Sequence, residues 1–104
     1  MQTPEGEVKA KLKAWLDVRG AYHFWPVQTG MGARGIDCYT CFAGRFIAYE
    51  CKAYGCKPTA LQRKILEDTD KAGGMAFIVT TDETGEHLLF IPVQAGGTKV
   101  AAVI

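Results

Sequence analysis

Two strand-forming runs separated by only two residues constrain the fold of this chain more than any other feature. Residues 36–42 and 45–53 are rich in β-branched, aromatic and small apolar side chains, and Ala43-Gly44 lies between them. A two-residue connection between such runs predicts an antiparallel hairpin. We therefore expect these runs to be neighbouring strands in one sheet.

This hairpin predicts an acidic pair on one face of the sheet. A two-residue connection makes Phe42 and Arg45 partners. Counting outward from that pair places Asp37 opposite Glu50, with their Cβ atoms about 5 Å apart. Lys52, two positions farther along, shares the face of Glu50. A glycine bulge at the connection would shift this register by one residue.

Two carboxylates and an ammonium on one face suit the hydrolysis of a phosphodiester. Mg²⁺ prefers oxygen ligands and keeps several waters, so one or two carboxylates with a substrate phosphate suffice. Asp37 and Glu50 would supply the carboxylates, and the backbone carbonyl of Cys51 is a third ligand. Lys52 would hold the attacking water or balance charge on the phosphate. The alternative is an exposed ion pair worth well under ~1 kcal/mol, although apolar neighbours indicate a mostly buried strand.

A helix is expected before the hairpin, from Thr3, an N-cap followed by a proline, to about Arg19. Glu5 falls on its apolar stripe, whereas Glu7 does not. An acid on a core-facing stripe predicts a cationic partner, and Glu5 would complete a metal shell directly or through water. The alternative is a solvated first-turn glutamate favoured by the helix dipole.

A second helix is expected from Pro58-Thr59 to about Ala72, with Gln62 inside its apolar stripe. A core-facing amide predicts a specific bonding partner, although a place at the helix shoulder explains it equally well. The other expected elements are strands at 22–28, 75–80 and 87–92, with an edge strand or interface element at 99–104.

This order of elements predicts an α/β fold in which a mixed sheet is flanked by helices. The strand after the second helix is reached by a long crossover, which favours a parallel neighbour. With 104 residues, the chain is expected to be a single domain, 1–104, with one core of modest size.

Composition narrows the function classes. Twelve Lys and Arg against eleven Asp and Glu give a net charge of +1, so DNA affinity would need a local basic face, a metal or a second subunit. No run approaches the ~20 apolar residues that cross a bilayer, and the polar, acidic N-terminus is unlike a secretory signal. We therefore expect a cytoplasmic protein without membrane association, whose cysteines are thiols.

The cysteines and histidines do not predict a zinc site or a nucleophile. Cys38 and Cys41 are an odd number of residues apart on a strand and should point to opposite faces, whereas a zinc knuckle needs both on a turn. His23 and His87 stand singly in apolar strands, as packed or surface histidines do. Cys51 has no evident activating base, so a thiol nucleophile is a weak alternative.

Taken together, these residues resemble the PD-(D/E)XK nuclease superfamily, and most of all its virus-type replication–repair branch, VRR-NUC. The resemblance spans about Thr3 to Thr80 and is carried by Gly35-Ile36-Asp37, Glu50-Cys51-Lys52, Lys57-Pro58-Thr59-x-x-Gln62 and Ala72-Gly73-Gly74. It implies a restriction-endonuclease-like α/β core. Ile36 stands where the superfamily name has proline, at a position that mainly sets strand entry.

The resemblance also implies roles for individual residues. Asp37 and Glu50 would bind Mg²⁺ or Mn²⁺, Lys52 would serve the nucleophilic water, and Gln62 would support the site. Glu5 would be the first-helix acid, chosen over Glu7 by the stripe geometry. No organic cofactor is implied.

Small free-standing members of this branch are similar to Holliday-junction resolvases, which are homodimers selective for branched DNA. We therefore expect a metal-dependent, structure-selective DNA endonuclease acting on four-way junctions as a homodimer, in recombination or repair within a bacterial or phage-infected cell. Two subunits would join their basic surfaces, formed by Lys9, Lys11, Lys13, Arg34, Lys57, Arg63 and Lys64. The alternatives are a flap or single-strand nuclease and a non-catalytic DNA-binding module whose acids are structural.

Overall fold

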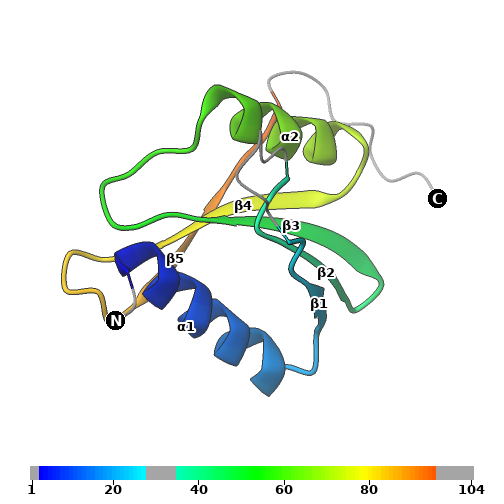
Figure 1. The fold of residues 1–104 in the computed structure, drawn as a ribbon. Coiled ribbons are helices and arrows are strands. Elements are labelled where there is room, and N and C mark those ends of the chain that lie inside the picture. The colour runs from blue at the N-terminus through cyan, green and yellow to red at the C-terminus, as the bar shows by residue number, and fades with distance from the viewer. Residues whose placement is uncertain (1–2, 28–34, 96–104) are drawn as a thin grey trace.

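The computed structural model describes residues 3–27 and 35–95, in which two helices cover opposite faces of one five-stranded sheet (Figure 1). The strands lie across the sheet in chain order; β3 and β4 are parallel, and the other neighbours are antiparallel. The predicted α/β class with a mixed sheet is thus confirmed. The elements are α1 (Pro4–Val18), β1 (Tyr22–Phe24), β2 (Cys38–Phe42), β3 (Arg45–Cys51), α2 (Ala60–Lys71), β4 (Met75–Thr81) and β5 (Leu88–Pro92).

Both helices begin close to the predicted positions, and each begins at a threonine N-cap, of which Thr3 was predicted from the sequence. Thr3 is the N-cap of α1, and its hydroxyl accepts a hydrogen bond from the Gly6 N–H at 3.0 Å. Thr59 is the N-cap of α2. α1 ends before Gly20, whose φ of 71° lies in the left-handed region that favours glycine. The cap chemistry therefore fixes where each helix starts.

The hairpin has the predicted register. Phe42 pairs with Arg45, and Cys38 pairs with Tyr49 at the far end of β2. Both turn residues have positive φ, 52° at Ala43 and 75° at Gly44, as a two-residue turn that matches the strand twist requires. No bulge intervenes between these pairs, so the next step outward sets Asp37 against Glu50.

Four strands are shorter than predicted. β1 ends at Phe24, two residues before Pro26, which has no N–H to donate to the ladder. β2 begins at Cys38 rather than at residue 36, and β3 ends at Cys51 rather than at residue 53. β5 begins at Leu88, one residue late. The element predicted at 99–104 lies outside the described residues.

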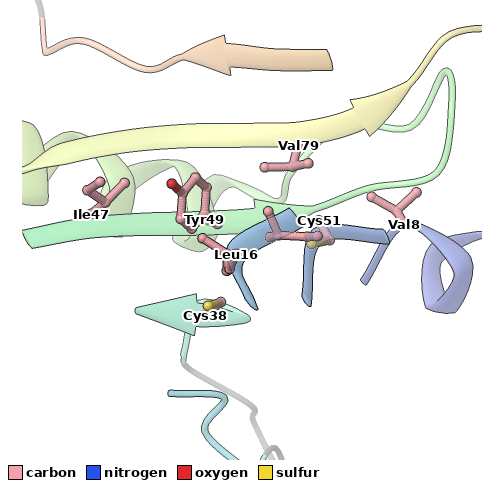
Figure 2. Packing of buried hydrophobic residues seen from close by; sticks show 8 residues of the cluster. Val8, Leu16, Cys38, Ile47, Tyr49, Cys51 and Val79 are labelled. Atoms are coloured by element: carbon pink, nitrogen blue, oxygen red, sulfur yellow. The ribbon is translucent and has the colours of Figure 1, made fainter. Parts of the chain in front are cut away.

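The sheet separates two cores. On the α1 side, β3 and β4 pack against the helix (Figure 2), and the buried residues are Val8, Leu12, Leu16, Cys38, Ile47, Tyr49, Cys51 and Val79. On the α2 side, the buried residues are Ile36, Ala48, Leu66, Ala76, Ile78 and Val93. Glu50 continues the row of Ala48 on the α2 side, because alternate residues of a strand share a face. Neither helix in the described ranges is long and apolar enough to cross a membrane.

Candidate active site

Three acids and two lysines meet beside the start of β2 and the end of β3. Asp37 immediately precedes β2, Glu50 lies near the end of β3, and Lys52 follows that strand. Glu5 and Lys9 come from the first turns of α1, on the other side of the sheet. Because β2 starts only at Cys38, Asp37 lies just outside the strand, and the Lys9 ammonium of α1 reaches its carboxylate. We call these five residues the acidic cluster.

Each of the two central acids, Asp37 and Glu50, accepts a hydrogen bond from the main chain at or next to the other. Glu50 Oε1 accepts a hydrogen bond from the Asp37 N–H at 3.2 Å, and Asp37 Oδ2 accepts one from the Cys51 N–H at 2.9 Å. Both side chains are buried, with 8% of Asp37 and 1% of Glu50 exposed. One oxygen of each carboxylate is thus fixed by the backbone, and the second oxygens, Asp37 Oδ1 and Glu50 Oε2, face ammonium groups.

The lysines connect these acids to Glu5. Lys9 Nζ lies 3.4 Å from both Asp37 Oδ1 and Glu5 Oε2. Lys52 Nζ lies 3.4 Å from Glu50 Oε2 and 3.9 Å from Glu5 Oε1. Glu5 therefore bridges two lysines, which are the cationic partners that its place on the stripe predicts.

Sequence reasoning missed Lys9, which falls outside the apolar stripe of α1. Its spacing of four residues from Glu5 was the available signal, since such pairs meet on one helix face. The long aliphatic stem of a lysine lets its ammonium lie well away from its own Cα, so a projection by helix angle alone underestimates its reach. In the structure, Lys9 is the direct partner of Asp37.

Burial sets the electrostatics of the cluster. It raises the pKa of Glu50 to about 7, with the nearby Asp37 carboxylate acting in the same direction and Lys52 opposing. Burial acts to lower the pKa of Lys9, but the carboxylates of Asp37 and Glu5 outweigh it, so this pKa lies above its ordinary value. Three carboxylates against two ammonium groups leave the fully ionised cluster negative, which favours an added cation.

The donor chemistry fits a hard divalent ion. No group of three or more His, Cys, Asp or Glu side chains within residues 3–27 and 35–95 is arranged to hold a metal. Two carboxylate oxygens suffice for Mg²⁺ when water and phosphate complete the octahedron. Asp37 Oδ1 and Glu50 Oε2 are the two candidate oxygens, because each faces a lysine ammonium that a metal ion could replace. The Cys51 carbonyl lies on the same strand edge as its N–H, which faces Asp37. Glu5, held between two lysines, would act through water.

Gln62 is occupied at the start of α2. Its Oε1 accepts a hydrogen bond from the Thr59 N–H at 2.9 Å, and its own N–H donates to Thr59 Oγ1 at 3.2 Å. These two bonds form a capping box. The amide oxygen therefore serves the helix terminus, and a supporting role in the acidic cluster stays a prediction for the amide nitrogen.

The predicted DNA-binding cations lie at the surface, apart from Arg34, which is outside the described residues. Lys57 is exposed. Arg63 lies 3.6 Å from Glu67, and Lys64 lies 3.0 Å from Asp68, each across one helical turn. Such exposed pairs are weak, so a phosphate can compete for both cations.

The cysteines and histidines lie in surroundings typical of structural rather than catalytic residues. Cys38 is buried and Cys41 exposed, which confirms that they point to opposite faces. Burial raises the pKa of Cys38 to about 11 and that of Cys51 further, so neither thiol is activated as a nucleophile. His23 and His87 bond aspartates at 2.7 and 2.8 Å, as surface or packed histidines do.

Comparison of the chain with protein-family models, with curated proteins and with solved structures gave no match. The function of the acidic cluster is therefore judged on its own chemistry. That chemistry comprises two buried carboxylates and two lysines, one beside each carboxylate, with Glu5 of α1 between the two lysines.

Proposed function

We propose that this chain is a divalent-metal-dependent endodeoxyribonuclease with a restriction-endonuclease-like PD-(D/E)XK core of the VRR-NUC type. The observation that carries the proposal is the buried Asp37–Glu50 pair with Lys52 beside it. Burying two carboxylates next to each other costs free energy, and Lys9 and Lys52 offset that cost only in part, because the fully ionised acidic cluster keeps a net charge of −1. The raised pKa of Glu50 reports that cost. The order helix, hairpin, crossover helix and parallel strand is also the order that such a core requires.

The charge count of the acidic cluster suits a phosphodiester. With a bound divalent cation, the cluster changes from a net charge of −1 to +1, which complements the single negative charge of a DNA phosphate. A bound metal would supply charge neutralisation and an acidified water. Asp37 and Glu50 would hold that metal, with the Cys51 carbonyl as a third protein ligand.

Each protein group then has a stated task in hydrolysis. Lys52 Nζ, 3.4 Å from Glu50 Oε2, would orient the attacking water and stabilise charge that develops on the phosphate. The water oxygen bonds to phosphorus, the phosphorus–oxygen bond opposite it breaks, and the leaving oxygen takes up a proton. Glu5, which lies between the two lysines, would hold the ammonium groups of Lys9 and Lys52 in place.

We further propose that the substrate is branched DNA, cut at four-way junctions by a homodimer. A net charge of +1 gives one chain little attraction for DNA, whereas two subunits double the basic surface and present two acidic clusters related by a two-fold axis. Two symmetric cuts resolve a junction. In the cytoplasm of a bacterial or phage-infected cell, this activity would serve recombination or repair.

The test uses purified protein with a labelled four-way junction, a flap and a linear duplex of matched sequence. We expect cleavage of the junction with Mg²⁺ or Mn²⁺ and none with EDTA. Asp37→Asn, Glu50→Gln and Lys52→Met should each lose at least about a hundredfold in rate. Glu7→Gln, which alters an exposed acid of the same helical turn, should cut as the wild type does.

Two results would contradict the proposal. One is cleavage that continues in EDTA, and the other is full activity of Glu50→Gln. Faster cutting of the flap than of the junction would keep the nuclease but replace the resolvase by a flap enzyme. Salt-sensitive binding of DNA without any cleavage would leave a DNA-binding module in which the acids are structural.

A further inference from the structure

A groove of about 660 Å³ lies on the α2 side of the sheet. It is bounded by the connection that follows β3, by the start of α2, and by β4 and β5. We call it the α2-side groove. Its lining residues that matter here are Tyr54, Lys57, Arg63, Ile78, Thr80 and Leu89.

The sheet register places this groove one strand away from the acids. Glu50 pairs with Ile78 in the parallel β3–β4 ladder, and the Lys52 N–H donates to the Val79 carbonyl at 2.9 Å. The next pair along the ladder is Lys52 and Thr80. Paired residues of parallel strands project from the same face about 4.8 Å apart. Ile78, which lines the groove, is therefore the cross-strand neighbour of Glu50 in the acidic cluster.

Thr80 carries an unmet hydrogen-bonding need in this groove. The residue is 9% exposed, and in the described part of the chain its Oγ1 is the buried side-chain oxygen without a hydrogen-bond partner. Native proteins pair nearly all such groups, because an unpaired one costs stability. Rotation about the Cα–Cβ bond exchanges the hydroxyl and the methyl, and a molecule in the groove could supply the partner.

The walls combine the chemistries that recognise a nucleotide. Tyr54 presents an aromatic ring at the rim and is 59% exposed, and the side chains of Ile78 and Leu89 supply apolar surface. Lys57 and Arg63 add two cations at the same groove. Single-stranded nucleic acid is bound in this way, with bases stacked on aromatic rings and phosphates held by cations.

We propose that the α2-side groove receives an unpaired nucleotide of the strand whose phosphodiester lies at the acidic cluster. This inference rests on the proposed nuclease function and adds to it a substrate requirement. A groove of this volume matches one small organic molecule, and a base held inside it has left its pairing partner. The preferred DNA therefore has unpaired nucleotides beside the cut, as at a branch point or a frayed end.

The test measures binding rather than cleavage, in EDTA, by fluorescence anisotropy of a labelled short oligothymidylate. Tyr54→Ala should weaken binding about tenfold, the loss expected when one base loses its aromatic partner. Tyr54→Phe, which keeps the ring, should bind as the wild type does. Thr80→Val should weaken binding several-fold, whereas Thr80→Ser, which keeps the hydroxyl, should not. Thermal unfolding of each variant shows that the losses do not come from unfolding.

The outcomes separate this inference from the proposed function. Unchanged binding by Tyr54→Ala and Thr80→Val would overturn the inference, as would equal affinity for a linear duplex. Glu50→Gln serves as the counterpart, because it should abolish cleavage yet leave oligothymidylate binding in place. A wild-type protein that binds through Tyr54 and Thr80 but cuts no DNA would refute the nuclease proposal alone.

Discussion

Glu50 illustrates how a single buried carboxyl group makes stability depend on pH. Its pKa is raised to about 7, chiefly by burial and then by Asp37, whereas in the unfolded chain it is about 4.3. Between these values the folded state binds the extra proton. Stability of the metal-free protein therefore falls as pH rises through this window, and it is insensitive to Glu50 above the window.

We expect Glu50→Gln to reveal this dependence. The amide can still accept the Asp37 N–H bond but carries no charge, so the variant avoids the cost of ionisation. Its advantage over the wild type should grow from about pH 5 to about pH 8, reaching at most on the order of 3 kcal/mol. Urea unfolding of both proteins in EDTA measures the difference. An advantage that does not change with pH would contradict the assigned pKa.

Thr80 gives a second prediction at this scale, in which function and stability have opposite signs. Valine has nearly the shape of threonine and lacks the hydroxyl that is buried without a partner. Thr80→Val should therefore raise the free energy of unfolding by about 1–2 kcal/mol, although it weakens oligothymidylate binding. Chemical denaturation without ligand tests this. A destabilised variant would mean that the hydroxyl already has a partner in solution.

At the scale of whole elements, two roles of Gln62 at the start of α2 can be tested separately: capping the helix and supporting the acidic cluster. Gln62 closes the capping box with Thr59, and glutamate is the other residue that suits this position. Gln62→Ala should cost about 1 kcal/mol of stability, while Gln62→Glu should stay close to the wild type. Equilibrium unfolding compares the two. Equal losses of unfolding free energy in both variants would argue against the capping role. The cleavage rate of the folded Gln62→Glu protein tests the role of the amide nitrogen, because this variant keeps the cap.

Local chemistry explains which elements were predictable. The hairpin register followed from the turn at Ala43-Gly44, and the start of α1 followed from its Thr3 cap. The end of β1 at Phe24 was not predicted, although Pro26 inside the expected strand was the available signal. The α2-side groove was beyond reach, since it joins segments around residues 54–63, 78–81 and 89–91 that only the folded sheet brings together.

For the candidate site, the predicted acids and the lysine do share one end of the hairpin, because strand alternation determines their faces. Sequence alone could not show that Lys9 reaches Asp37, since a long flexible side chain follows no fixed period. It also could not show that Asp37 and Glu50 bond each other's main chain. Those bonds depend on β2 beginning at Cys38 rather than at an earlier residue. The strand propensities of the neighbouring residues do not predict that start.

At the scale of the whole molecule, near-neutral charge makes assembly part of the proposed function. A chain of net charge +1 gains little from DNA phosphates by itself. We expect sedimentation at assay concentrations to show a dimer. Mixed dimers of wild-type and Glu50→Gln chains should nick one strand of a junction and leave it unresolved. A monomer that resolves junctions would overturn the dimer proposal.

The reciprocal bonds between Asp37, Glu50 and the adjoining main chain have an evolutionary corollary. Either acid, once replaced by a residue that cannot accept these bonds, would loosen the open end of the hairpin as well as remove a metal ligand. Selection for a folded chain would thus preserve a hydrogen-bond acceptor at both positions in descendants that no longer cut DNA. Divergence after loss of catalysis should begin instead at Lys52 and Glu5, whose side chains make no such backbone bonds among the described residues.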